Sequence, residues 1–101
     1  MKGVFMTKAE LITILSNAKG ELQEQFGIAK IALFGSYARD EASSDSDVDI
    51  AIIQIEKKDY FNRVEAKYYL EKLLGKHVDI GYFDSMRPII QKYIRKDMIL
   101  V

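Results

Sequence analysis

Apolar side chains recur three or four residues apart near the start of the chain, at Leu11, Ile14, Leu15, Ala18, Leu22 and Phe26. This spacing predicts a helix over about residues 8–25, with one face turned toward a core. Thr7, followed by Glu10 three residues later, has the pattern of a capping box at the start of this helix. Gly27 is placed where a left-handed residue would end it.

Three short runs rich in β-branched and aromatic residues follow, at 30–34, 48–53 and 77–82. Their length and composition predict three β-strands. Between the first two strands, the segment from Ser36 to Ser46 holds turn-forming and charged residues. Ser36 is a suitable N-cap, so we expect a short helix to begin there.

A second long helix is expected from Lys57 to Leu74, where Gly75 would close it. Its apolar positions fit two overlapping helical stripes: Phe61, Val64, Ala66, Tyr68, Leu70, Leu73 and Leu74.

A last helix is expected to follow the third strand, with Asp84 or Ser85 as its cap. Pro88 would lie in its first turn, where a missing backbone amide costs nothing. Its expected buried face consists of Ile89, Ile90, Tyr93 and Ile94. Lys92, Arg95 and Lys96 would lie near its carboxyl end, where basic side chains favour the helix dipole. The apolar tail, Met98 to Val101, is expected to form a short strand or a docking segment.

Helices and strands thus alternate along the chain, which predicts an α+β fold: a small mixed β-sheet of three or four strands with helices packed on it. The length of 101 residues fits one domain over 1–101. Apolar residues make up 49% and charged residues 30% of the chain, which is typical of a globular protein with one core.

Charge and cysteine content exclude several classes of function. Fifteen basic and fifteen acidic residues cancel, which argues against a non-specific nucleic-acid binder. The absence of cysteine rules out disulfides and thiolate metal sites. No apolar run reaches the length of a signal peptide or a membrane span. We therefore expect a cytoplasmic protein that does not contact membranes.

The junction after the first strand is a candidate phosphate site. Gly35 permits an unusual backbone conformation and close approach of a ligand, and Ser36 adds a hydroxyl. Free amides at the start of a following helix would favour phosphate oxygens. A Gly-Ser turn is also common as a turn alone, so this feature carries little weight by itself.

Two carboxylates begin the second strand. Asp47 and Asp49 are two residues apart, so a strand would direct both to one face. Two carboxylates so close repel one another unless a cation or proton lies between them. Oxygen ligands of this kind suit Mg²⁺. If the second and third strands are neighbours, Asp79 joins them, and three carboxylates could hold two metal ions for displacement at phosphorus.

Other interpretations of this segment remain. Residues 40–49 contain five acids and no base, which is also typical of a solvated acidic loop. A Ca²⁺ loop is excluded, because Ile50 stands where the loop needs Gly. No Gly-Lys-Ser/Thr follows Gly35, so a Walker phosphate loop is excluded too. His77, the only histidine, is expected to lie on the surface.

The string Gly35-Ser36-Tyr37-Ala38-Arg39, then Ser46-Asp47-Val48-Asp49, resembles a motif of the nucleotidyltransferase superfamily that includes DNA polymerase β. In length and motif the chain is similar to the smallest branch, the minimal nucleotidyltransferase (MNT) proteins. This resemblance covers nearly the whole chain. Asp40 departs from the Gly that is often seen after the Arg of the motif.

The resemblance implies the polymerase β-like fold and a set of site residues. Asp47, Asp49 and Asp79 would be the catalytic carboxylates and would bind Mg²⁺, two ions being expected. Gly35 and Ser36 would hold the phosphates of ATP. Arg39 matches an Arg of the family, and a local ion pair with an acid is the alternative role for it.

The resemblance also implies a partner. MNT proteins typically pair with a HEPN-domain ribonuclease toxin, and family members silence it by transferring AMP from ATP to one of its tyrosines. The chain would then be an antitoxin, alone as a homodimer or in a hetero-oligomer with the toxin. Two alternatives are an antitoxin that acts by binding alone and a transferase for a small molecule such as an aminoglycoside.

Overall fold

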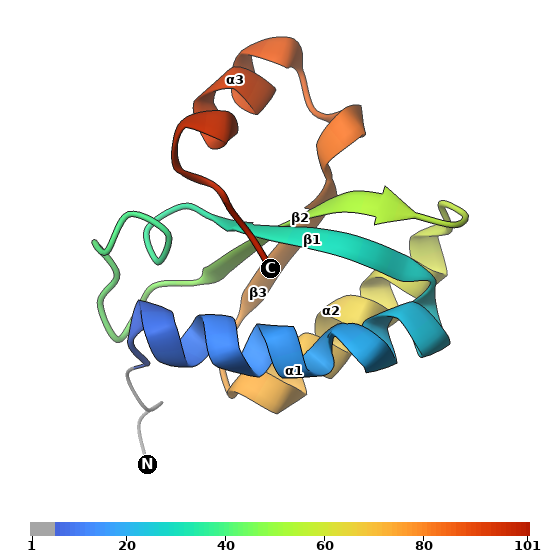
Figure 1. Ribbon diagram of the computed structural model, residues 1–101, viewed down its shortest axis with the longest axis horizontal. Helices are drawn as coiled ribbons and strands as arrows, with labels where there is room; N and C mark the ends of the chain where they lie inside the picture. Colours follow the sequence, from blue (N-terminus) through green and yellow to red (C-terminus); the bar gives the residue numbers. More distant parts are fainter. Residues whose placement is uncertain (1–5) are drawn as a thin grey trace.

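The computed structural model describes residues 6–101; the first five residues of the expected single domain lie outside the described residues. The helices are α1 (Lys8–Phe26), α2 (Tyr60–Leu74) and α3 (Pro88–Asp97), and a 3₁₀ turn spans Phe83–Ser85. The strands are β1 (Ile28–Phe34), β2 (Val48–Ile55), β3 (Val78–Tyr82) and β4 (Ile99–Leu100). Figure 1 shows their arrangement.

The four strands form one mixed sheet in the order β3-β2-β1-β4. β1 runs antiparallel to both β2 and β4, whereas β2 and β3 are parallel. The α+β fold and the small mixed sheet are therefore confirmed. The second and third strands are neighbours, which meets the condition under which Asp79 joins the other carboxylates. The apolar tail forms β4, which pairs with Ala32 and Leu33 in the second half of β1.

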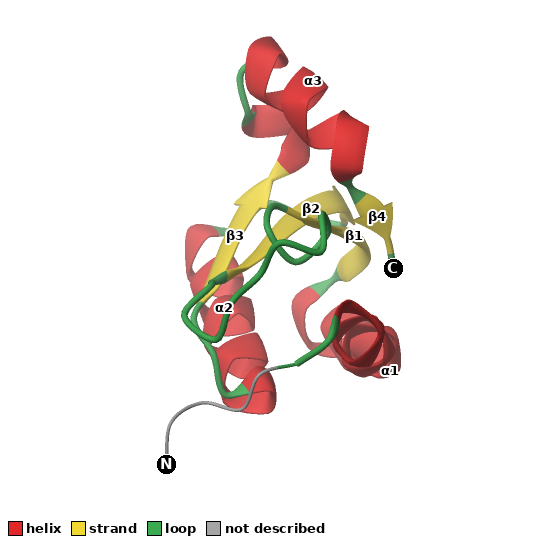
Figure 2. Ribbon diagram, turned by 90° about the vertical axis from the view of Figure 1, so that its left-hand side faces the viewer, coloured by secondary structure: helices red, strands yellow, loops and turns green. Residues whose placement is uncertain are grey.

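One face of the sheet is covered by α1 and α2, and α3 rises from the opposite face (Figure 2). The core lies between the sheet and the first two helices. Along β2, Val48, Ile50 and Ile52 are buried in this core. Because side chains alternate along a strand, Asp49 points to the other face. The same alternation on β3 buries Val78 and Ile80 and leaves Asp79 exposed.

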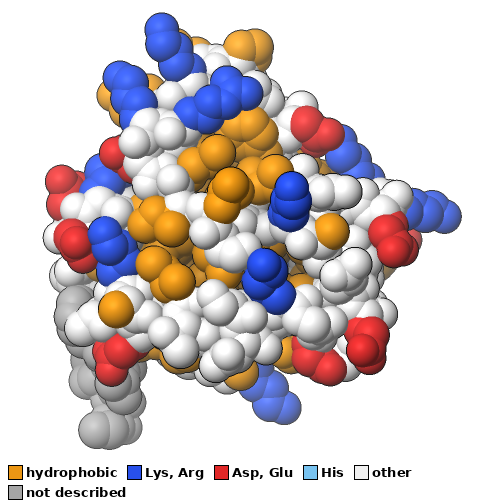
Figure 3. Space-filling model, viewed as in Figure 1, with side chains coloured by type: hydrophobic (Ala, Val, Ile, Leu, Met, Phe, Trp, Pro, Cys, Tyr) orange, Lys and Arg blue, Asp and Glu red, His pale blue; other side chains and the backbone are white. Residues whose placement is uncertain are grey.

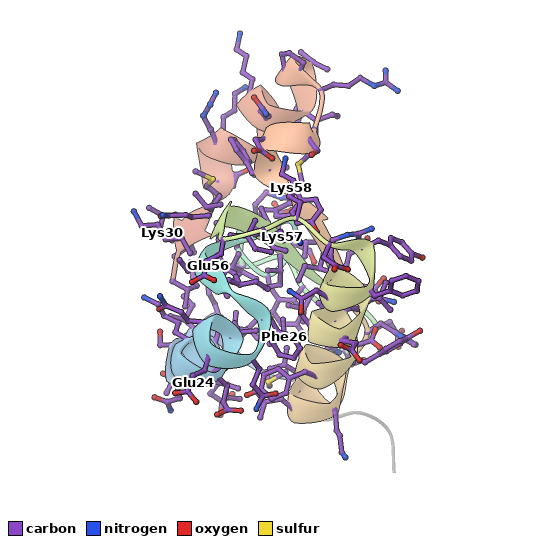
Figure 4. The ribbon with its side chains drawn as sticks, turned by 90° about the vertical axis from the view of Figure 1, so that its right-hand side faces the viewer. Glu24, Phe26, Lys30, Glu56, Lys57 and Lys58 are labelled. Atoms are coloured by element: carbon purple, nitrogen blue, oxygen red, sulfur yellow. The ribbon has the colours of Figure 1, made fainter. Side chains whose placement is uncertain are left out.

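The end of the molecule away from the carboxylates joins the two long helices to the strands (Figure 4). Phe26, the last residue of α1, lies between α1 and α2, and its ring centroid is 5.6 Å from that of Tyr69. Asn62 of α2 donates a hydrogen bond of 2.6 Å to the Phe26 carbonyl. The expected capping box of Thr7 and Glu10 is present at the other end of α1.

The predicted short helix at Ser36 does not form. Only one turn follows β1: the Arg39 amide donates to the Gly35 carbonyl (3.1 Å) and the Glu41 amide to the Ser36 carbonyl (2.8 Å). Asp40 then takes a left-handed conformation, φ +59°, which cannot continue a right-handed helix.

The last helix also differs from its prediction. Its N-cap is Arg87, with no side-chain cap, because Asp84 and Ser85 are already part of the 3₁₀ turn. Pro88 occupies the first helical turn, as expected. Of the predicted buried face only Ile94 is buried, and its other members, Ile89, Ile90 and Tyr93, are exposed.

The second helix forms close to its expected bounds, and Gly75 closes it as predicted. Its buried residues are Ala66, Leu70 and Leu74, whereas Phe61, Tyr68 and Leu73 of the predicted stripes are exposed. Helical spacing reports which side chains share a face, but it does not report what covers that face. Within residues 6–101, no helix is long and apolar enough to cross a membrane.

Candidate functional site

Gly35 marks the point where β1 ends and the chain turns toward the site. Its φ of +78° is left-handed, a conformation that costs an L-residue about 1–2 kcal/mol. A Cβ atom at this position would also collide with the carboxylate of Asp49, lying 2.9 Å from its Cγ. Glycine is therefore required both by the turn and by the carboxylate that packs against it.

The loop of residues 36–47 connects β1 to β2 and is anchored at two points. Tyr37 is 1% exposed and is among the largest fully buried side chains. Lys76 lies 5.8 Å from the centroid of the Tyr37 ring and donates a 2.8 Å hydrogen bond to the Ser44 carbonyl. The amides of residues 36–38 precede the first hydrogen bond of the turn, so they have no acceptor within it. They resemble the free amides of a helix start, but no full helix stands behind them.

The carboxylates meet where β2 begins beside β3. Asp49 of β2 is in direct register with Asp79 of β3, and in parallel strands such a pair points to the same face. Asp47 precedes β2, which begins at Val48, so it lies on the loop and not on the strand. Asp49 is half-buried, whereas Asp47 and Asp79 are exposed. We call these three residues the carboxylate cluster.

Asp49 is the electrostatic centre of this cluster. Its pKa is raised to about 6, mainly by burial and then by the negative charges of Asp79 and Asp47, while Arg39 acts in the opposite direction. A carboxyl with this pKa lies in an environment that disfavours its own negative charge. The site is therefore short of positive charge.

No basic side chain supplies that charge directly. Within residues 6–101, none of the three carboxylates forms a salt bridge. Arg39 instead pairs with Glu41, Nε to Oε1 at 3.0 Å, and its pKa is raised mainly by this hydrogen bond. Among the described residues no three carboxylate or imidazole groups are close enough to hold one ion together. The expected cluster of three is thus loose, with exposed outer members.

Two shallow cavities flank Phe34 at the end of β1. The first, which we call the acidic pocket, has a volume of about 220 Å³ and is lined by Phe34, Asp49, Ile50, Asp79, Ile80, Gly81 and Met86. The second, which we call the α3 pocket, has a volume of about 250 Å³ and is lined by Phe34, Gly35, Arg39, Ile90, Tyr93, Ile94 and Asp97. Asp49 and Asp79 thus share one cavity, and Gly35 and Arg39 line the other.

The sequence did not point to several of these lining residues. Phe34 was an ordinary strand residue, and Ile90 and Tyr93 were expected in the core. Met86 and Asp97 carried no signal in the pattern. His77 lies on the surface, as expected, with its side chain 88% exposed and Nδ1 3.5 Å from Glu71 Oε2.

Comparison with known proteins agrees with this geometry. The nucleotidyltransferase domain family matches residues 15–101. A protein adenylyltransferase, MntA, from Thermococcus cleftensis is 40% identical over 96 residues, which is 95% of this chain and 97% of that protein. A candidate protein adenylyltransferase of Methanocaldococcus jannaschii is also 40% identical over 96 residues, 94% of this chain and 98% of that protein.

Solved structures show the same fold. The structure of a candidate minimal nucleotidyltransferase superposes with a TM-score of 0.79 at 30% identity, covering 96% of this chain and 98% of that one. A toxin–antitoxin complex with AMP-PNP contains a chain that matches at a TM-score of 0.70 and 22% identity, covering 94% of this chain and 72% of that one. The carboxylate-bearing strands, the glycine turn and these likenesses together lead to one conclusion: this chain belongs to the nucleotidyltransferase domain family and is a nucleotidyltransferase.

Proposed function

We propose that this chain is a Mg²⁺-dependent protein adenylyltransferase that transfers AMP from ATP to a tyrosine of a HEPN-domain ribonuclease toxin and so acts as its antitoxin. The observation that carries this proposal is the register of Asp49 with Asp79 beside the Gly35 turn. It brings carboxylates from two strands together beside the turn that we propose as the phosphate site.

The donor set fits Mg²⁺. The cluster offers hard carboxylate oxygens, and no basic side chain of the described residues is bound to them. Mg²⁺ usually takes one or two protein carboxylates and completes its shell with water and substrate phosphates, so a loose cluster is sufficient. Asp49 and Asp47 would hold the metal, with Asp79 beside it. The bound metal would supply positive charge to the phosphoryl oxygens.

The remaining chemistry falls to the chain's own residues. The amides of the Gly35 turn and the Ser36 hydroxyl would hold the phosphates of ATP. Asp79, exposed at the rim of the acidic pocket, would accept the proton of the acceptor hydroxyl. The tyrosine oxygen then forms a bond to the α-phosphorus, the bond from that phosphorus to the pyrophosphate oxygen breaks, and pyrophosphate leaves.

Arg39 has a supporting role in this proposal. It lies on the turn after Gly35, lines the α3 pocket and acts on the charge of Asp49. Its bond to Glu41 holds it beside the loop. This is the local ion pair that was the alternative role for Arg39, and it leaves the other guanidinium nitrogens free to face a phosphate.

The acceptor is assigned to a separate protein because both cavities are open and shallow. Neither encloses enough of a small molecule to bury it, since pockets for such ligands are usually deeper and larger. Several relatives are named protein adenylyltransferases, which also favours a protein acceptor.

The test is labelling of the protein encoded beside this chain with α-labelled ATP and Mg²⁺. We expect the wild type to label it and Asp47→Asn to reduce the rate by about 100-fold or more, because a metal ligand is lost. Asp45→Asn is the matched control, since Asp45 is an exposed acid of the same loop, and it should retain activity.

Three outcomes would contradict the proposal. An unlabelled partner that wild type and Asp47→Asn inhibit equally would indicate an antitoxin that acts by binding alone. Full activity without Mg²⁺ would exclude the metal. Labelling of an aminoglycoside, but not of the protein, would make the chain a small-molecule transferase.

A further inference from the structure

α3 is a helix that packs on its own protein through very little of its surface. Ile94 is its only buried side chain among the described residues. Ile89, Ile90 and Tyr93 are 61%, 45% and 69% exposed. Residues at this spacing lie on the same side of a helix, so the three form one exposed apolar stripe.

The charge of α3 differs from that of the rest of the chain. Arg87, Lys92, Arg95 and Lys96 are basic, and Asp97 is the single acid of the segment 87–97. This segment therefore carries +3, and the other residues together carry −3, since the chain is neutral. Figure 3 shows the Lys and Arg side chains gathered over α3.

These cations are not neutralised by acidic side chains within residues 6–101. None of Arg87, Lys92, Arg95 and Lys96 forms a salt bridge there. Lys96 lies over the ring of exposed Tyr93, 5.6 Å from its centroid, and Arg95 lies 5.1 Å from that of Phe83. Positive charge and apolar surface are thus joined in one patch.

The patch is continuous with the candidate active site. Ile90 and Tyr93 line the α3 pocket together with Gly35 and Arg39. Phe34 is shared between that pocket and the acidic pocket of Asp49 and Asp79. A protein seated on α3 would therefore stand directly beside the place where the phosphates and the carboxylates meet.

We propose that the α3 patch, Ile89, Ile90, Lys92, Tyr93 and Lys96, is the docking surface for the acceptor protein, whose facing surface is acidic around an apolar centre. This proposal rests on the proposed function, because it needs a protein acceptor. Complementary charge would orient the partner, and the exposed aromatic and aliphatic side chains would provide its buried anchors.

A protein partner fits better than a lipid surface. The helix has ten residues, and its stripe has three apolar side chains, with the acid Asp97 at its edge. Helices that bind membranes need a longer apolar face, and cations along their whole polar face strengthen the binding. Three apolar residues with a basic rim are instead typical of a small anchor within a larger protein interface.

The experiment compares two double variants against the protein encoded beside this chain. Ile89→Ser/Lys92→Glu changes the patch at residues that line neither pocket. Phe61→Ser/Lys72→Glu makes the same kind of change on α2, where Phe61 is 76% exposed. Calorimetry measures the Kd for the partner, and initial rates measure the KM for ATP and for the partner. Circular dichroism and the unfolding midpoint check that both variants fold.

We expect the α3 variant to raise the Kd for the partner at least about 30-fold, because it loses side chains that anchor the interface. Its KM for the partner should rise, while kcat and the KM for ATP stay unchanged. The α2 variant should bind within about twofold of the wild type, because exposed residues outside an interface contribute little.

The outcomes separate the two proposals. A wild type that binds the partner without labelling it contradicts the proposed chemistry, and the Kd values still test the docking surface. Equal binding and labelling by both variants would overturn the docking surface alone. The docking surface would also be overturned if the wild type did not bind the partner. The same holds if the α3 variant bound the partner normally but no longer bound phosphatidylserine vesicles.

Discussion

At the residue scale, the close packing of Gly35 against Asp49 makes a sharp prediction. Gly35→Ala places a Cβ atom where the carboxylate of Asp49 lies, so the carboxylate must move. We expect transfer activity to fall by about 100-fold or more and stability to fall by about 1–2 kcal/mol from the left-handed backbone. Labelling rates and urea denaturation measure the two effects.

Gly75→Ala is the control for that variant. Gly75 has nearly the same backbone conformation, φ +68°, but nothing lies within 4 Å of its added Cβ. It should therefore lose similar stability and keep its activity. If Gly35→Ala lost no more activity than Gly75→Ala, the packing against Asp49 would not matter for the reaction.

The raised pKa of Asp49 predicts how stability depends on pH. Its pKa in the folded protein is about 6, against an ordinary value of 3.8, so the folded state holds this proton more tightly than the unfolded state. The stability that Asp49 contributes is then complete below about pH 4, declines as pH rises to about 6, and is absent above that.

Asp49→Asn should remove this decline. In EDTA, the free energy of unfolding of the variant should fall less than that of the wild type between pH 4 and pH 6. At pH 7.5 the variant should be at least as stable, because a repelled charge is gone. Urea denaturation across this range, with Asp45→Asn as control, tests the prediction, and parallel curves for Asp49→Asn and wild type would refute it.

The residue types of the site could be predicted from the sequence, but their packing could not. The spacing of Asp47 and Asp49, and the apolar run around Asp79, indicated strands and a shared face. Nothing in the sequence showed that Gly35 makes room for Asp49, because this contact depends on how β1 and β2 pair. The ion pair of Arg39 with Glu41 could be predicted in kind, as a local pair with an acid, because the two residues are close in the chain.

At the scale of elements, the loop of residues 36–47 depends on one buried aromatic side chain. The hydroxyl of Tyr37 has no hydrogen-bond partner among the described residues, and an unpaired buried hydroxyl is unfavourable by about 1–3 kcal/mol. Tyr37→Phe should therefore keep full activity, with stability unchanged or raised by about 1 kcal/mol. Tyr37→Ala should lose about 3–5 kcal/mol from the cavity it leaves.

Thermal and urea unfolding of the two Tyr37 variants, followed by labelling assays, test this role of the loop. If Tyr37→Phe were strongly destabilised, the hydroxyl would have a partner that the packing does not reveal. If Tyr37→Ala kept full activity, the buried ring would not be needed to place the loop.

The helices show where sequence patterns stop being informative. The capping box and Gly27 fixed the ends of α1, because caps act locally. The predicted short helix at Ser36 does not form because Asp40 takes a left-handed conformation. The neighbouring residues gave no sign of this conformation. The outer face of α3 was predicted to be buried because an apolar stripe looks the same whether it packs on its own chain or stays exposed.

At the scale of the whole molecule, the sheet order explains why the site lies where it does. β1 and β2 are antiparallel neighbours, so the end of β1 meets the start of β2. β3 is parallel to β2, so its start lies at the same end. Gly35, Asp49 and Asp79 therefore converge although they are far apart in the sequence. The sheet face that carries them is opposite the face covered by α1 and α2, and α3 stands over it (Figure 2).

The packing of Gly35 against Asp49 also limits how this sequence can evolve. While the carboxylate is present, no side chain at position 35 has room, so the two positions are coupled although they are 14 residues apart. A lineage that lost Asp49 would relax the steric limit at position 35 but would keep the backbone limit, so Asn, which tolerates left-handed conformations, would be accepted there before Val or Ile. The order of the two changes matters. A substitution at position 35 harms activity while Asp49 is present, and it has little further effect on activity once Asp49 is lost. This dependence of one substitution on the other residue, which is epistasis of magnitude, would separate active descendants of this chain from inactive ones.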